Sequence, residues 1–306
     1  MPKSGREKSP PNGTAALETL QGEVPLKVGF NLLVVGGFIT AEHGPLFEKL
    51  KALGYDGVEL PMFEGTPDHY QGVGRVLRDC GLEATTCAIM TEAENPISAD
   101  ALIRAEAGKR LRWAIDCTHA LGGGVVMGPF HSPLGVFSGN GASEDELGRL
   151  AEVMRAGAAY GAGLGVALSL EPLNRFECYV LNTMAQAGAL ARRVDHPNFG
   201  VTYDTFHANI EERDPVAAFT AHAGAVNHIH LSENDRGIPG RGHVPFGPTI
   251  RAIRGTGYDG WLTVEAFGRS VPALSAATRV WRDLFPDLDT LFAESITLIR
   301  REWAAA

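Results

Sequence analysis

The sequence predicts a single (β/α)₈ barrel, an α/β fold in which eight parallel strands alternate with helices. Short apolar runs alternate with helical-looking stretches along the chain of 306 residues, and eight such runs occur without a break in composition. Strict alternation requires parallel strands joined by right-handed crossovers, and eight such units favour a closed barrel. An open doubly wound sheet is the alternative, but no G-x-G-x-x-G follows the first predicted strand.

The first half of the chain supplies four of these units. Gly54 and Gly81 each follow an amphipathic stretch directly, as glycines that end helices do. The predicted strands are LKVGFNLLV (26–34), YDGVELP (55–61), LEATTCAIM (82–90) and GGVVMGPF (123–130). The predicted helices span residues 44–54, 68–80 and 99–121.

The second half of the chain continues the alternation. Ser143 is a predicted N-cap, and Glu146 lies three residues on, which is the spacing of a capping box at the start of a helix. The predicted strands are VALSLEP (166–172), FGVTYDT (199–205), VNHIHLS (226–232) and WLTVEAF (261–267). The further predicted helices span residues 183–194, 214–223 and 247–255, and a terminal helical region occupies residues 271–303.

Composition and charge exclude several classes of protein. Lys and Arg total 27 against 36 for Asp and Glu, and the net charge of −9 argues against nucleic acid or an anionic membrane as the main partner. No apolar stretch is long enough to span a bilayer. Residues 1–23 lack the apolar run of a secretory signal and are expected to form a disordered tail before a domain over 24–303. The four cysteines include no C-x-x-C pair, which favours a reduced cytoplasm.

The carboxyl ends of the last four predicted strands each carry an ionisable residue. These residues are Glu171, Asp204, His230 and Glu265, set into otherwise apolar runs. In a barrel of this kind the carboxyl ends of the strands build the active site. Burial of four such groups in one place needs a compensating charge, and three carboxylates with one imidazole suit Mn²⁺, Mg²⁺ or Co²⁺ better than a structural zinc.

Each of these residues also has a purely structural interpretation. A single carboxylate at a strand end is more often a cap, and a single histidine is more often a core residue; the coincidence of four is what favours a metal site. On the seventh predicted strand His228 shares a face with His230, and we assign His230 because it lies nearer the carboxyl end. Further polar residues follow the strands: Glu59, Asn174, Arg175, Glu177, His207, Glu233 and Arg236. Glu59 is also a candidate cap of the next helix, and Arg175 and Arg236 are also candidates for ordinary loop charges.

Four segments resemble the ketose 3-epimerases, the D-tagatose and D-psicose 3-epimerase group of xylose-isomerase-like TIM barrels. They are LEPLNRFE (170–177), YDTFHANIEE (203–212), HIHLSENDR (228–236) and GYDGWLTVEAF (257–267). The resemblance is strongest over residues 165–300 and weaker in the first half. It departs from the family where the loop after the first strand contains no Trp and where Ala266 follows Glu265.

The resemblance implies an activity and a set of site residues. In this family the residues that match Glu171, Asp204, His230 and Glu265 hold one divalent metal, usually Mn²⁺ or Co²⁺. The residues that match Glu177, His207 and Arg236 bind the O1–O3 end of the sugar. Glu171 and Glu265 then form the acid/base pair, which removes a proton at C3 and returns one to the other face through a metal-bound enediolate. Relatives are commonly homodimers or homotetramers, and some relatives pair with a second, different subunit.

Other activities remain open on the sequence alone. The same site chemistry serves a lyase that acts on 3-oxo-glycosides, an aldose–ketose isomerase or an inosose dehydratase. A metal-dependent AP endonuclease of this fold would need clustered metals and a basic groove, and the charge of −9 opposes it. A non-catalytic sugar-binding barrel is the remaining alternative.

Overall fold

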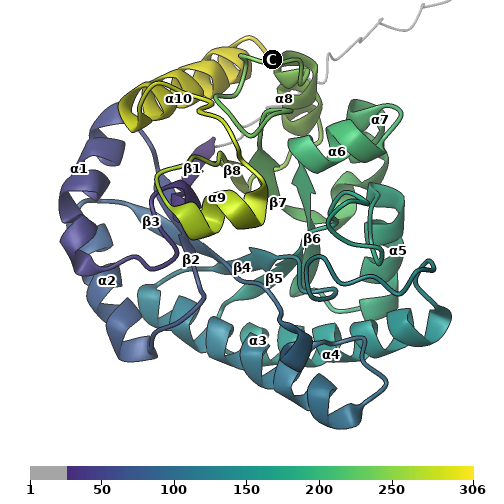
Figure 1. The fold of residues 1–306 in the computed structure, drawn as a ribbon. Helices are drawn as coiled ribbons and strands as arrows, with labels where there is room; N and C mark the ends of the chain where they lie inside the picture. Colours follow the sequence, from purple (N-terminus) through teal and green to yellow (C-terminus); the bar gives the residue numbers. More distant parts are fainter. Residues whose placement is uncertain (1–25) are drawn as a thin grey trace, which may run out of the picture.

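A computed structural model describes residues 26–306 and shows a closed barrel of eight parallel strands in sequential order (Figure 1). Strand β1 pairs with β2 on one side and with β8 on the other, which closes the barrel. The predicted fold class is therefore confirmed. The strands are β1 (Lys27–Asn31), β2 (Gly57–Pro61), β3 (Glu83–Cys87), β4 (Val125–Gly128), β5 (Ala167–Leu170), β6 (Phe199–Asp204), β7 (Val226–Leu231) and β8 (Trp261–Val264).

Helices surround the barrel, and α9 lies across its centre in Figure 1. The predicted capping box at the start of α4 is present, because Ser143 and Glu146 each bond the other's backbone N–H. Gly54 ends α1 in the left-handed conformation at φ 98°. The helices are α1 (Gly44–Leu53), α2 (Pro67–Asp79), α3 (Ala101–Leu121), α4 (Glu144–Ala162), α5 (Met184–Val194), α6 (Thr205–Glu211), α7 (Pro215–His222), α8 (Phe246–Gly255), α9 (Pro272–Thr278) and α10 (Leu288–Ala304).

The structure differs from the predicted elements at the carboxyl ends of the strands. The first predicted strand stops at Asn31, whose side chain accepts the backbone N–H of Leu33 and turns the chain into a 3₁₀ turn over Leu32–Val34. The predicted helical region over 271–303 contains two helices, α9 and α10, and α6 was not predicted. The predicted tail, residues 1–23, lies outside the described residues, so the domain boundary at residue 24 stays a prediction.

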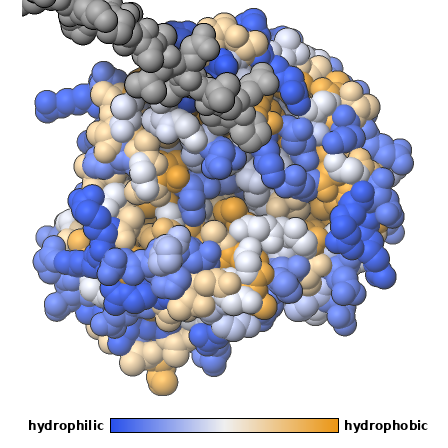
Figure 2. Space-filling view, turned by 180° about the vertical axis from the view of Figure 1, so that it is seen from behind, coloured by the Kyte–Doolittle hydropathy of each residue, from blue (hydrophilic) through white to orange (hydrophobic). Residues whose placement is uncertain are grey.

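The hydrophobic core lies inside the barrel and between the barrel and its helices. Phe30 on β1 packs edge-on against Tyr55 and against Phe292 of α10, with ring centroids 5.6 and 4.7 Å apart. Hydrophilic side chains cover much of the face seen in Figure 2. Among residues 26–306 no helix combines the length and the apolar character that crossing a membrane requires.

A glycine at the end of β4 brings two loops of the barrel mouth together. Gly128 has φ 145°, and a Cβ there would lie 2.0 Å from the carbonyl oxygen of Ala88. Only glycine fits this approach. The carbonyl oxygen of Gly128 accepts the backbone N–H of Glu171, which positions the start of the loop after β5.

Candidate metal centre and active site

Four ionisable side chains converge at the carboxyl end of the barrel. Asp204 ends β6, His230 lies on β7, and Glu171 and Glu265 directly follow β5 and β8. All four are at least 94% buried. One ligand atom from each lies within 4.8 Å of the others. The structure therefore brings together the four residues that the sequence singled out as metal ligands.

The potential metal-ligand atoms of this cluster face one another, and two of them form no hydrogen bond within residues 26–306. His230 Nδ1 lies 3.4 Å from Glu265 Oε1, 3.6 Å from Glu171 Oε1 and 4.0 Å from Asp204 Oδ2. Among the described residues neither His230 Nδ1 nor Glu171 Oε1 has a hydrogen-bond partner. Buried polar atoms without partners are costly, and a cation between them would satisfy both. Oxygen donors with one imidazole nitrogen fit a divalent cation such as Mn²⁺.

Burial and the closely spaced negative charges shift the pKa values of the three carboxylates in the cluster. Burial, with the charges of Glu265 and Asp204, raises the pKa of Glu171 well above its usual range. Burial also raises the pKa of Asp204 to about 6. Burial acts in the same direction on Glu265, but His230 and Arg236 outweigh it and lower its pKa. A bound cation would favour the ionised form of all three carboxylates.

Glu59 orients the imidazole of His230 through its Nε2 atom. The Glu59 carboxylate lies 2.7 Å from His230 Nε2 and 2.8 Å from His228 Nε2, and it accepts hydrogen bonds from Asn31 and Thr85 at 2.9 Å each. Because Nε2 is bound to Glu59, Nδ1 faces the cluster. The alternative that Glu59 caps the next helix is wrong, since Glu59 is fully buried and Thr66 caps α2.

Arg236 lies beside two of the predicted metal ligands. Its Nη1 donates to Glu265 Oε2 at 2.6 Å and to Asp204 Oδ2 at 3.1 Å. Its guanidinium carbon lies 3.8 Å from the ring centroid of Phe206 and 4.9 Å from that of Phe267. Arg236 adopts a left-handed backbone conformation at φ 67° and is only 8% exposed. The alternative of an ordinary loop charge is therefore wrong for this residue.

His207 is held as a neutral imidazole between donors. Its Nδ1 accepts the backbone N–H of Asn174 at 3.0 Å. Burial and the nearby Arg236 lower the pKa of His207 well below its usual range. Its Nε2 lies 3.0 Å from Arg236 Nη2, a nitrogen that can only donate. Glu177 lies close by and accepts the Asn174 side-chain amide at 2.7 Å.

A cavity of about 190 Å³ lies above the cluster, and we call it the inner cavity. Its polar lining comes from Glu171, Glu177, His207, Arg236, Glu265 and Thr278. The rest of its lining is largely apolar and includes Leu33, Phe63, Ile89, Met127 and Phe267. The structure thus places the three predicted substrate-binding residues in one cavity with both members of the predicted acid/base pair.

Two of the other polar residues singled out in the sequence have structural partners. Arg175 pairs with Glu211 and has a 62% exposed side chain, as an ordinary loop charge does. Glu233 accepts three backbone N–H groups, from Asn234, Gly240 and Val244, and so organises the loop after β7. No pattern in the sequence singles out Asn31, Thr85, Phe206 or Phe267, because their partners lie far away along the chain.

The chain matches the family described as "Xylose isomerase-like TIM barrel" over residues 47–300. The match spans most of the chain, and the chain belongs to this family.

Relatives within the family define a narrower group. The chain is 32% identical over 290 residues to a ketose 3-epimerase of Arthrobacter globiformis, covering 92% of this chain and 98% of that protein. It is 30% identical over 252 residues to an L-ribulose 3-epimerase of a Methylomonas species, covering 82% and 88%. A crystal structure of the D-allulose 3-epimerase of Methylomonas in complex with D-allulose superposes with a TM-score of 0.84 at 29% identity, covering 90% of this chain and 97% of that one. The chain therefore belongs to the ketose 3-epimerase group. These relatives are isomerases acting on carbohydrates, as predicted.

Proposed function

We propose that this protein is a metal-dependent ketose 3-epimerase that interconverts the C3 epimers of a free ketose. The observation that carries the proposal is the position of the four-residue cluster. Its two outer carboxylates, Glu171 and Glu265, line the same cavity as His207 and Arg236. The names of the relatives support the reaction, since they describe ketose, L-ribulose and D-psicose 3-epimerases.

The proposed ligands of the cation are Glu171, Asp204, His230 and Glu265, and Mn²⁺ is the expected metal, with Co²⁺ or Mg²⁺ as substitutes. The cation supplies Lewis acidity, which makes the proton beside a ketone carbonyl acidic enough to remove. Glu59 keeps the imidazole of His230 in the orientation that ligation needs.

The side chains of the chain itself would hold the sugar and move the proton. The Arg236 guanidinium donates hydrogen bonds to the oxygens at the C1–C2 end, His207 Nε2 forms a further hydrogen bond there, and Glu177 accepts one from a hydroxyl. Because these groups are pinned by Asn174 and by the two phenylalanines around Arg236, the geometry is set before proton transfer. Glu265 and Glu171 then act in turn, one removing the C3 proton and the other delivering a proton to the opposite face.

Exchange of the C3 proton tests the proposal directly. The protein loaded with Mn²⁺ is incubated in D₂O with D-fructose, D-tagatose, D-psicose and L-ribulose, and the C3 position is followed by NMR. We expect deuterium at C3 together with the epimer for at least one of these sugars. Absence of exchange with every free ketose, together with release of an aglycone from a 3-oxo-glycoside, would instead identify a lyase.

A further inference from the structure

A second and larger pocket adjoins the inner cavity. It measures about 430 Å³, and we call it the outer pocket. The two share five lining residues: Glu177, Phe206, Arg236, Ala277 and Thr278. The short helix α9 contributes to both linings, so the two pockets lie side by side along α9.

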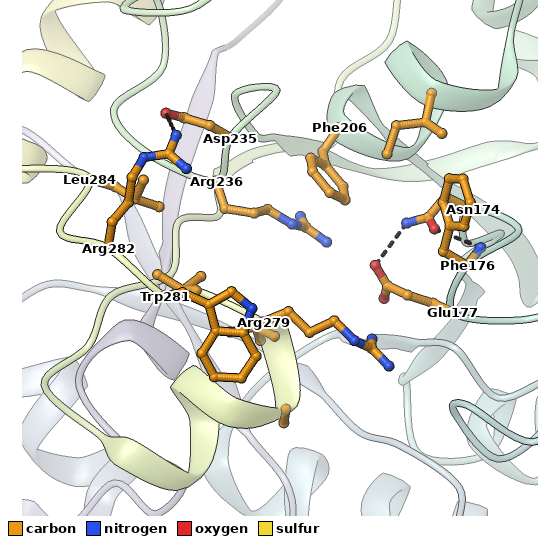
Figure 3. A pocket seen from close by; sticks show the side chains of 14 residues that line it. Asn174, Phe176, Glu177, Phe206, Asp235, Arg236, Arg279, Trp281, Arg282 and Leu284 are labelled. Carbon is orange, nitrogen blue, oxygen red and sulfur yellow. Dashed lines mark hydrogen bonds and ion pairs between the residues drawn. The ribbon is translucent and has the colours of Figure 1, made fainter.

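The outer pocket carries exposed aromatic rings. Trp281 is 71% exposed and Phe176 is 68% exposed, although residues of their size are usually packed against neighbours. In Figure 3 Trp281 lies on one side of the pocket, Phe206 on another and Phe176 beside Glu177. Rigid aromatic faces next to polar groups suit a ring that is apolar on its faces and polar at its rim. A sugar ring has this character.

The charges of the outer pocket favour a neutral ligand. Arg282 lies 3.4 Å from Asp235, and Arg236 is paired with Asp204 and Glu265. The remaining arginine of the lining, Arg279, shares the pocket with the carboxylate of Glu177. A phosphate would thus meet a lining whose cations are largely matched by carboxylates, whereas hydroxyl groups would find both donors and acceptors.

The size of the inner cavity limits how large a ligand it can enclose. Its volume of about 190 Å³ is below the roughly 300–1,000 Å³ of sites that enclose a drug-sized ligand. A substituent as large as a second sugar unit on the ketose would therefore lie outside it. We propose that the outer pocket is a subsite for a second, neutral sugar unit attached to the far end of the ketose. The substrate class is then a glycosyl-ketose rather than a free ketose alone, and this inference rests on the proposed function.

A comparison of two sugars in one assay tests the subsite. The full-length protein with Mn²⁺ is assayed in D₂O with D-fructose and with the same ketose carrying a glucosyl unit on O6. We expect a kcat/KM for C3 exchange about tenfold higher for the glucosyl-ketose. Trp281→Ala and Phe176→Ala should each lower that value about 3- to 10-fold and change the value for D-fructose less than twofold, since neither residue lines the inner cavity.

Controls separate the subsite from the reaction itself. Leu102→Ala removes an equally exposed apolar side chain (76%) outside the outer pocket and should alter neither substrate. Exchange with D-fructose but none with the glucosyl-ketose, or equal losses on both sugars in the Trp281 variant, overturns the subsite and leaves the proposed function standing. A preference for D-fructose 6-phosphate over the glucosyl-ketose also overturns it. Exchange with no ketose of either kind overturns the proposed function itself.

Discussion

The two halves of the barrel contribute differently to the same site. Strands β5–β8 supply the four candidate ligands from their carboxyl ends. Strands β1–β3 supply Asn31, Glu59 and Thr85; Asn31 and Thr85 both donate to Glu59, and Glu59 holds His230 from the opposite wall. Asn31 also reaches Glu265 at 3.3 Å. One half therefore provides the groups that bind, and the other half provides the groups that orient them.

This division explains why the site residues of the second half can be predicted from the sequence more easily than those of the first half. A ligand must be an ionisable residue at a strand end, and four in succession form a pattern. A group that orients a ligand needs only a hydrogen bond to it across the barrel, and Asn, Thr and Glu all provide one. The following predictions test whether the two halves act as this division requires.

The largest effect is expected in the second half. Glu171→Gln and Glu265→Gln should each lower the rate of C3 exchange about 10³-fold or more, because each removes both a metal ligand and an acid/base group. The matched control is Glu211→Gln, which alters a nearly buried carboxylate that pairs with Arg175 outside the inner cavity. Substantial exchange by either variant would remove that residue from the proposed pair.

In the first half we expect an effect on metal affinity. Glu59→Gln leaves the ligands unchanged but replaces the acceptor of His230 Nε2–H by an amide, and Mn²⁺ affinity should fall about 10- to 100-fold. Competition with a fluorescent chelator measures the affinity without any turnover. Thermal unfolding in the absence of metal shows whether the variant still folds. An unchanged Mn²⁺ affinity in a folded variant would contradict the division between the halves.

Protons compete with the cation for the carboxylate ligands, so the metal affinity depends on pH. The pKa of Asp204 is raised to about 6 and the pKa of Glu171 is raised well above its usual range, and a cation binds only their ionised forms. At pH values well above these pKa values, Mn²⁺ affinity should therefore be constant. At pH values below them, the affinity should fall about tenfold per pH unit for each protonated group. Titration calorimetry across this range checks the slope, and an affinity that does not change between pH 5 and 7 would be inconsistent with it.

The smallest effect is expected from a single hydrogen bond of the first half. Thr85→Val removes the bond to Glu59 Oε2 but keeps Glu59, so Mn²⁺ affinity should fall only about threefold. The same chelator competition measures it. A loss as large as that of Glu59→Gln would show that Thr85, rather than the carboxylate, orients His230.

Much of the fold could be predicted because its signals are local. Gly54 and the pair Ser143–Glu146 mark the ends of helices within a few residues. The predictions failed where tertiary contacts decide the local structure. Asn31 turns the chain after β1, and the last segment divides into α9 over the mouth and α10 on the barrel wall.

By itself the sequence determined the order of strands and helices and the four ionisable residues at successive strand ends. Both follow from regularities along the chain, namely apolar periodicity and the alternation of side chains on a strand. Only the tertiary structure decided that Glu59 holds His230, that two phenylalanines enclose Arg236, and that an aromatic pocket adjoins the inner cavity. These contacts join residues that are distant in sequence, and closure of the barrel is what places them within hydrogen-bond or van der Waals distance.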